Sequence, residues 1–302
     1  MKLPSFYSTI AVANFSLLAL NLIVFYNSLL AKFVVNQQED IPHTRSWDNK
    51  EDGWNAIHVY YGKREPLPSP KVHESWNSSQ AGQDTIIAAL TDEYQKWLPH
   101  SQKRRQFYFI DLAANDATQL SNTYNLEKTN HWTGLCIEPN PVYWERLAHR
   151  TCIVVAAFVG GTEDLQPVQV FMNNFAMGGI VREDMDNKPE SNKEYSEKYT
   201  VSLRSVFQRH QVPYIIDYLS LDVEGSETMI MKDFPFDTYS FRFMTVERPK
   251  PELRDNFQSH GYQFIQDISS FGETLWVHES VIQNGLDKVK IQSIVKSVMV
   301  EE

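Results

Sequence analysis

Short apolar runs alternate with amphipathic segments along the chain after residue 78. The runs predict strands at residues 107–110, 135–137, 153–157, 168–172, 214–221, 241–246, 262–265 and 274–277. The spacing of apolar side chains predicts helices through Leu120 and Tyr124, around Trp144 and Leu147, and over Leu203, Val206 and Phe207. Strands that alternate with helices are typical of an α/β fold, so we expect a doubly wound, mostly parallel sheet. The last two strands are close in sequence, which favours a final strand inserted antiparallel.

One stretch interrupts this pattern. Residues 182–198 contain four basic and six acidic residues and no apolar period. Such a charged segment is typical of a solvated face, so we interpret it as an insertion or a lid over a site.

The N-terminal part of the chain contains one long apolar stretch. Residues 10–30 are 21 consecutive residues without a charge, between Lys2 and Lys32. A helix of that length covers about 30 Å, the hydrocarbon thickness of a bilayer, so a transmembrane signal anchor is predicted. A cleavable signal peptide and an amphipathic arm are the alternatives. The flanking charges weakly favour a cytoplasmic tail at residues 1–9 and a luminal remainder.

Residues 31–78 are polar and rich in proline, with no sustained apolar period. This composition is typical of a stem that holds a folded domain away from a membrane. The sequence Asn77-Ser78-Ser79 within it is a glycosylation sequon. We expect the folded domain at residues 79–280 and a helical C-terminal tail at residues 281–302.

Composition and charge exclude several classes of protein. With 42% hydrophobic and 22% charged residues, the chain is neither disordered nor collagen-like. Its net charge of −10 excludes a broad nucleic-acid surface, because phosphate binding needs positive charge. Cys136 and Cys152 are too few for a disulfide-stapled module or a zinc ribbon. Both lie in apolar strands, which favours free thiols over a disulfide between them.

Acidic residues follow the first two predicted strands, where an open α/β sheet binds its ligands. Asp111 begins a run of small residues to Ala117, and Glu138 lies 27 positions after Asp111. Glu138 could accept both ribose hydroxyls of an adenosine cofactor. No Gly-x-Gly-x-x-Gly sequence follows the first strand, so S-adenosylmethionine is favoured over a pyrophosphate cofactor. Taken alone, the Asp111 segment could instead be a tight turn in which the carboxylate caps a helix.

Four segments together resemble the FkbM family of S-adenosylmethionine-dependent methyltransferases. They are Ser79–Asp84, Asp111–Ala117, Gly134–Pro141 and Ser220–Glu227. The resemblance implies a Rossmann-like class I methyltransferase sheet. Members of the family usually have glycine at the positions of Ala113 and Ala117.

The resemblance also implies roles for individual residues around the cofactor. Adenine-packing residues would end the third strand, although plain core positions are an equal alternative there. The implied cofactor-binding residues are Asp111, Ala113 and Asn115 at the methionine end, Glu138 at the ribose with Asn140 near it, and Ala156, Ala157 and Phe158 at the adenine.

Asp222, Glu224 and Glu247 follow the fourth and fifth predicted strands and are the candidate catalytic residues. A carboxylate could act as general base on an acceptor hydroxyl, or the three could hold a divalent metal. We favour the base without a metal, because three carboxylates without a histidine form a weak, hard-cation site. For Glu224 and Glu247, pairing with Arg248 or helix capping is the alternative.

Two functions are compatible with these residues. The first is an O-methyltransferase acting on a hydroxyl of a glycan or small molecule, anchored in the Golgi or endoplasmic reticulum with its domain in the lumen. The second is a catalytically silent binding or trafficking protein, because membrane proteins of the Star type also resemble this family. The Asp111–Glu138 pair favours the enzyme.

Overall fold

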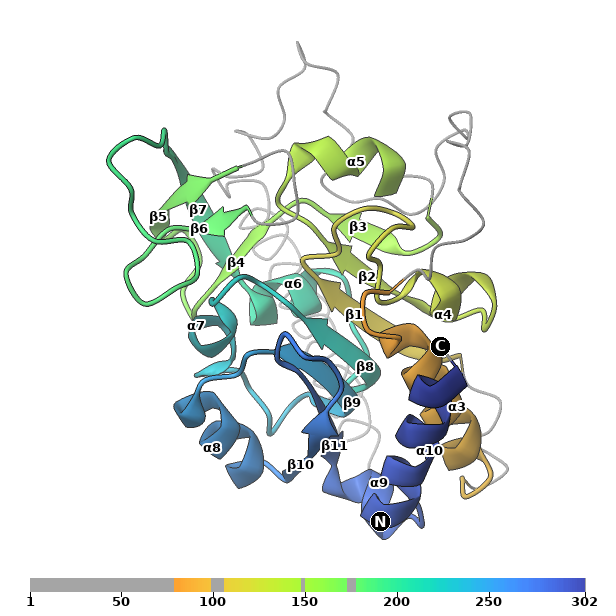
Figure 1. The fold of residues 1–302 in the computed structure, drawn as a ribbon. Helices are drawn as coiled ribbons and strands as arrows, with labels where there is room; N and C mark the ends of the chain where they lie inside the picture. Colours follow the sequence, from red (N-terminus) through yellow and green to blue (C-terminus); the bar gives the residue numbers. More distant parts are fainter. Residues whose placement is uncertain (1–78, 99–105, 148–149, 173–177, 302) are drawn as a thin grey trace, which may run out of the picture. The chain divides into compact units, whose positions relative to one another are not determined.

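A mostly parallel sheet forms the centre of the fold in the computed structural model, which describes residues 79–98, 106–147, 150–172 and 178–301 (Figure 1). Its strands are β1 (Tyr108–Leu112), β2 (Thr133–Ile137), β3 (Ile153–Val155), β8 (Ile215–Leu221), β9 (Ser240–Glu247), β10 (Tyr262–Asp267) and β11 (Glu273–His278). In the described part of the chain their spatial order is β10-β11-β9-β8-β1-β2-β3. Only β11 runs antiparallel to its neighbours β9 and β10. The predicted doubly wound sheet with an inserted antiparallel final strand is therefore confirmed.

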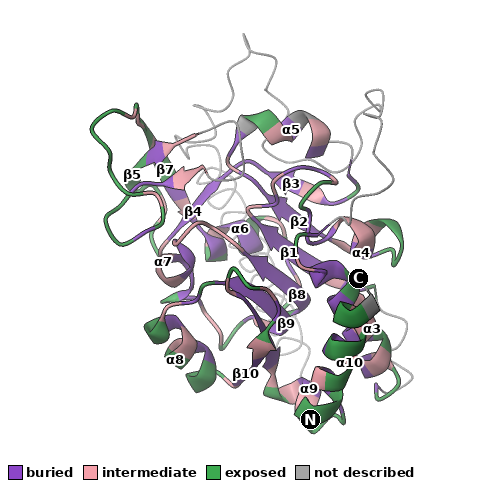
Figure 2. Ribbon diagram, in the orientation of Figure 1, coloured by how far each residue is buried: buried purple, intermediate pink, exposed green. Residues whose placement is uncertain are grey.

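Helices cover both faces of this sheet, because its strands are apolar on both sides (Figures 1 and 2). Phe109 and Ile110, which are adjacent in β1, pack into two different cores. The core around Phe109 includes side chains of α3 (Gln83–Gln95), α4 (Tyr124–Lys128), α5 (Pro141–Leu147), α9 (Glu279–Gln283) and α10 (Lys288–Glu301). The core around Ile110 includes side chains of α6 (Leu203–Arg209), α7 (Glu227–Met231) and α8 (Pro251–Ser259).

The strand order reverses between β1 and β8. From β1 the chain builds β2 and β3 on one side and then returns to place β8 and β9 on the other. The crossover connections leave β1 and β8 in opposite directions, so the loops at their carboxyl ends diverge and leave a crevice. This edge of the sheet is where the structure provides room for a ligand.

A second, smaller sheet lies between β3 and β8 in the sequence. It contains β4 (Phe158–Gly160), β5 (Pro167–Phe171), β6 (Gly179–Ile180) and β7 (Ser196–Ser202), in the spatial order β4-β7-β5-β6 among the described residues. The strand predicted at 153–157 is present as β3 but ends two residues early, because the chain leaves the main sheet after Val155. Val155 pairs with Ile137, the last residue of β2, so a longer β3 would have no partner. The strand predicted at 168–172 belongs to this smaller sheet.

The helix predicted through Leu120 and Tyr124 is shorter than expected. Leu120 has a left-handed backbone conformation, with φ of 56°, and α4 begins only at Tyr124. The preceding turn is stabilised by Asp116, whose carboxylate accepts hydrogen bonds from the backbone N–H groups of Thr118 and Gln119, each at 3.0 Å. A local side-chain bond of this kind competes with helix formation.

The predicted anchor at residues 10–30, the stem and Asn77 of the sequon all lie outside the described residues. Within the described ranges, no helix combines the length and the apolar character that crossing a membrane requires. The anchor therefore stays a prediction from the sequence.

The contact between β1 and β2 leaves no room for a side chain at Gly134. A Cβ atom there would overlap the backbone oxygen and the ring of Phe109. We expect Gly134→Ala to lower the free energy of unfolding by about 1–3 kcal/mol, because the two strands would have to move apart. Denaturant unfolding measures this change. Gly161→Ala is the matched control, since its Cβ would lie 3.7 Å from the nearest atom, the oxygen of Met229. Equal stability of the two variants would contradict the close β1–β2 approach.

Candidate functional site

A cavity of about 370 Å³ lies at the carboxyl ends of the strands beside the order reversal. Residues from the ends of β1, β2, β8 and β9 line it, together with residues 178–180 at β6 of the smaller sheet and Phe271 before β11. The position is the one at which open α/β sheets bind small ligands.

The loop after β1 approaches this cavity with an unusual backbone. Ala113 and Asn115 line the cavity and have φ values of 64° and 56°. The backbone N–H groups of Ala113 and Ala114 donate to the carbonyl oxygen of Ile137 at 2.9 and 3.1 Å. These bonds bend the loop over the end of β2, where it forms one wall of the cavity.

Glu138 joins the loops after β1 and β2. One of its carboxylate oxygens accepts from the N–H of Asn115 at 2.8 Å, and the other accepts from the N–H of Asn140 at 2.6 Å. Each oxygen keeps a further lone pair, and the side chain lines the cavity. Burial raises the pKa of Glu138 to about 7, although the two backbone bonds act in the opposite direction. The carboxylate is thus held in place and available to hydroxyl donors.

The other predicted cofactor-binding residues divide into two groups. Asn140, Ala157 and Phe158 line the cavity with Ala113, Asn115 and Glu138. Ala156 does not line it and packs in the core around Phe109. The alternation of side chains at the end of the third strand explains why Ala156 and Ala157 face different sides.

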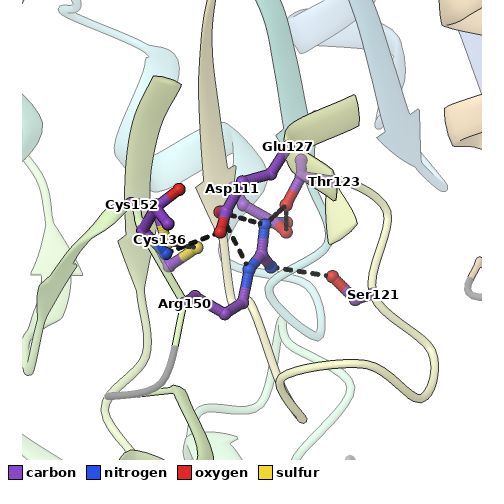
Figure 3. A network of polar contacts seen from close by, with 8 residues as sticks. Asp111, Ser121, Thr123, Glu127, Cys136, Arg150 and Cys152 are labelled. Carbon is purple, nitrogen blue, oxygen red and sulfur yellow. Dashed lines mark hydrogen bonds and ion pairs between the residues drawn. The ribbon is translucent and has the colours of Figure 1, made fainter. Parts of the chain in front are cut away.

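Asp111 also lies away from the cavity, contrary to its predicted place at the methionine end. Its carboxylate accepts a hydrogen bond of 2.5 Å from the hydroxyl of Thr123. Arg150 donates to Thr123 and Ser121 at 3.0 Å and pairs with Glu127 at 3.0 Å (Figure 3). Burial raises the pKa of Asp111, while the Thr123 bond and the charge of Arg150 act to lower it. These buried contacts hold the segment between β1 and α4 in place on the side away from the cavity.

The candidate catalytic residues Asp222, Glu224 and Glu247 all line the cavity. Asp222 and Glu224 follow β8 in a turn where Glu224 has φ of 53° and Gly225 has φ of 93°. The carboxylate atom Oδ1 of Asp222 is buried and has no hydrogen-bond partner among the described residues. Burial raises the pKa of Asp222, and the nearby Glu247 raises it further. Burial also raises the pKa of Glu224, to about 7.

Arg248 pairs with the acidic residues at this end of the cavity. Its guanidinium lies 2.6 Å from Glu247 and 3.5 Å from Glu224, so the alternative pairing predicted from the sequence is present. It also lies 2.7 Å from Asp186, in the charged insertion. Carboxylate oxygens of Asp186, Glu224 and Glu247 lie within 4.8 Å of one another, a spacing that could hold a metal ion. In this structure the guanidinium is the cation that they contact.

The comparison with known families agrees with this geometry. Residues 111–264, half of the chain, match the family model of the methyltransferase FkbM domain. The chain belongs to the FkbM methyltransferase family. No curated protein and no solved structure shows significant similarity to it.

Membership of the FkbM family shows that the chain is a methyltransferase. Ala113 departs from the glycine usual in the family, at a position where the backbone is left-handed. The glycine usual in the family would adopt the left-handed conformation of Ala113 freely, whereas a Cβ atom there costs about 1–2 kcal/mol. Ala117 is buried. The loop therefore has a left-handed residue at Ala113, with alanine at both positions where the family usually has glycine.

The two cysteines are free, as the sequence predicted. Their sulfur atoms contact each other at 2.6 Å between β2 and the residue before β3 (Figure 3). Both thiols are buried, and burial raises the pKa of Cys136.

Asn122 and Asp186 are among the residues of this site that sequence reasoning missed. Asn122 lines the cavity but falls where a helix was predicted, so no orientation could be assigned to it. Asp186 was one of six acidic residues in the charged insertion, and only the fold brings it to Arg248. The sequence signal that could have indicated Asn122 is its place between two other polar residues, Ser121 and Thr123.

The raised pKa of the buried Glu273 carboxyl makes the free energy of unfolding depend on pH. It is 1% exposed and pairs in register with Glu247, and burial raises its pKa to about 7 from 4.5. The folded state therefore binds more protons than the unfolded state between these values, so stability falls as pH rises from 4.5 through 7. We expect Glu273→Gln to reduce that loss by up to roughly 3 kcal/mol.

Urea unfolding at several pH values from 4 to 8 measures this effect. Glu183→Gln, at an exposed position of the insertion, is the control and should leave the slope unchanged. An unaltered slope in Glu273→Gln would show that this carboxyl is not protonated in the folded protein.

Proposed function

We propose that this chain is an S-adenosylmethionine-dependent O-methyltransferase acting on a hydroxyl of a glycan or small molecule. The observation that carries the proposal is one cavity with Glu138 at one end and Asp222, Glu224 and Glu247 at the other. When bound, S-adenosylmethionine supplies a methyl group on a cationic sulfonium. A cavity with several carboxylates suits a cationic donor and disfavours a pyrophosphate.

The residues at the β2 end fit an adenosine group. Glu138 has carboxylate lone pairs for two ribose hydroxyls, and the bonds from Asn115 and Asn140 prevent it from turning away. Ala157 and Phe158 provide a small, apolar surface for adenine beside it. Ala113 and Asn115 would lie against the rest of the cofactor.

The residues at the β8 end fit the removal of a proton from the acceptor. A hydroxyl is a weak nucleophile, and a base that removes its proton typically accelerates the reaction 10²–10⁴-fold. Asp222 is the proposed base, because its Oδ1 atom is buried without a partner in the described structure. Arg248 holds Glu247 and Glu224 beside it, so these two residues position the base and adjust its pKa.

The acidic cavity end favours an acceptor without negative charge, such as the hydroxyl of a neutral sugar. A membrane anchor at residues 10–30 with a luminal domain would place the enzyme among glycans in the Golgi or endoplasmic reticulum. That placement is a prediction from the uncharged stretch alone.

Glu138→Gln tests cofactor binding directly. Calorimetry with S-adenosylhomocysteine and the full chain should show about ten- to a hundredfold weaker binding, because charge-assisted hydrogen bonds to the ribose are lost. Glu183→Gln is the control for the purified protein, and unfolding curves check that both variants fold. No binding by the unmodified chain would favour the catalytically silent alternative.

Asp222→Asn tests the proposed base. We expect transfer of a labelled methyl group to a panel of neutral glycans to fall about 10²–10⁴-fold, while S-adenosylhomocysteine binds within about twofold of the original affinity. Chelation with EDTA should leave the activity of the unmodified chain unchanged. Loss of activity on chelation with recovery in Mg²⁺ would instead assign a metal to Asp186, Glu224 and Glu247.

A further inference from the structure

Asn122 lines the cavity and has a buried hydrogen-bond acceptor that no described residue uses. Its amide nitrogen donates to the hydroxyl of Ser220, on β8, at 2.9 Å. The residue is 8% exposed and lines the cavity. Its oxygen Oδ1 is buried and has no hydrogen-bond partner in the described part of the chain. A buried amide oxygen without a partner is unfavourable unless a ligand supplies the missing donor.

The neighbouring residues hold Asn122 in this orientation. Ser121 and Thr123 both accept hydrogen bonds from Arg150, and Thr123 donates to Asp111 (Figure 3). Ser121 and Thr123 are fully buried, so neither can rotate outward without breaking this network. With Ser220 fixing its nitrogen, the Asn122 side chain has one amide atom left for a ligand.

The position of Asn122 along the sheet edge indicates which part of the ligand it meets. Glu138 follows β2, Ala113 follows β1, and Asn122 is bonded to β8, so the three residues follow the spatial order β2-β1-β8. A ligand whose ribose contacts Glu138 and which passes Ala113 has its far end at Asn122. At the methionine end of S-adenosylmethionine the α-ammonium group is the hydrogen-bond donor, because the ionised carboxylate can only accept, so an acceptor oxygen there selects the ammonium group.

We infer that Asn122 binds the α-ammonium group of the cofactor's methionine end through its Oδ1 atom. The inference rests on the proposed function. It places Asn122 at the methionine end, where the family resemblance implied Asp111, whose carboxylate instead accepts a hydrogen bond from Thr123. Asp111 then acts as a positioning residue, through Thr123, for the segment that carries Asn122.

Three ligands that differ at this end test the inference by calorimetry with the full chain. They are S-adenosylhomocysteine, its analogue without the α-amino group, and 5′-methylthioadenosine, which lacks the whole aminoacyl end. Asn122→Leu removes the polar atoms at similar volume. We expect it to weaken S-adenosylhomocysteine about tenfold or more and to change the other two ligands by less than about twofold.

Two further variants separate recognition from structure. Asn122→Asp keeps an acceptor oxygen and should bind S-adenosylhomocysteine at least as tightly as the original chain. Asn284→Leu, at an exposed position after α9, is the remote control and should change nothing. Unfolding curves establish that each variant is folded.

The outcomes distinguish this inference from the proposed function. If the unmodified chain binds none of the three ligands, both the inference and the proposed function are overturned. Binding of all three with equal weakening in Asn122→Leu overturns the inference alone, because the loss would then not depend on the amino group. Unchanged binding of S-adenosylhomocysteine in Asn122→Leu also overturns it.

Discussion

The cavity depends on one buried carboxylate that holds two loops together. Glu138 accepts backbone hydrogen bonds from Asn115, after β1, and from Asn140, after β2. Parallel strands end at the same edge of a sheet, but the loops that follow them diverge unless contacts between the loops hold them together. Burial raises the pKa of this carboxyl, so keeping it charged at this position lowers the stability of the folded state. A group that is unfavourable for folding and lies in a cavity is typical of a functional site.

The opposite end of the cavity also contains buried carboxylates, but there a cation compensates part of their charge. Asp222, Glu224 and Glu247 meet where β8 and β9 end, and carboxylates this close repel one another. Arg248 relieves part of the repulsion, since it pairs with Glu247 and Glu224. Among the described residues no cation pairs with Asp222, and burial together with the nearby Glu247 raises its pKa. The arrangement thus separates one carboxylate that can exchange a proton from two that are held by a cation.

Periodicity and spacing predicted the sheet, its order reversal and Glu138, because these features depend on short-range patterns and on general rules for parallel strands. The same reasoning failed where a side chain had to be oriented. Asp111 was expected in the cavity, but alternation along β1 turns it toward Thr123. Leu120 was expected in a helix, but Asp116 captures the preceding backbone. Asn122 and Asp186 could not be found, since each joins the site only through contacts with strands distant in the sequence.

The insertion contacts the residues at the β8 end of the cavity through Asp186. The N–H of Asp186 donates to the carbonyl oxygen of Glu224, and its carboxylate pairs with Arg248. A Cβ atom on Gly225 would lie 2.7 Å from the nitrogen of Asp186, so the turn after β8 fits closely beneath this loop. Changes in the loop would therefore alter the position of Arg248 and of the turn after β8. Because Arg248 pairs with Glu247 and Glu224, and both of these residues raise the pKa of Asp222, the insertion cannot vary independently of the proposed base.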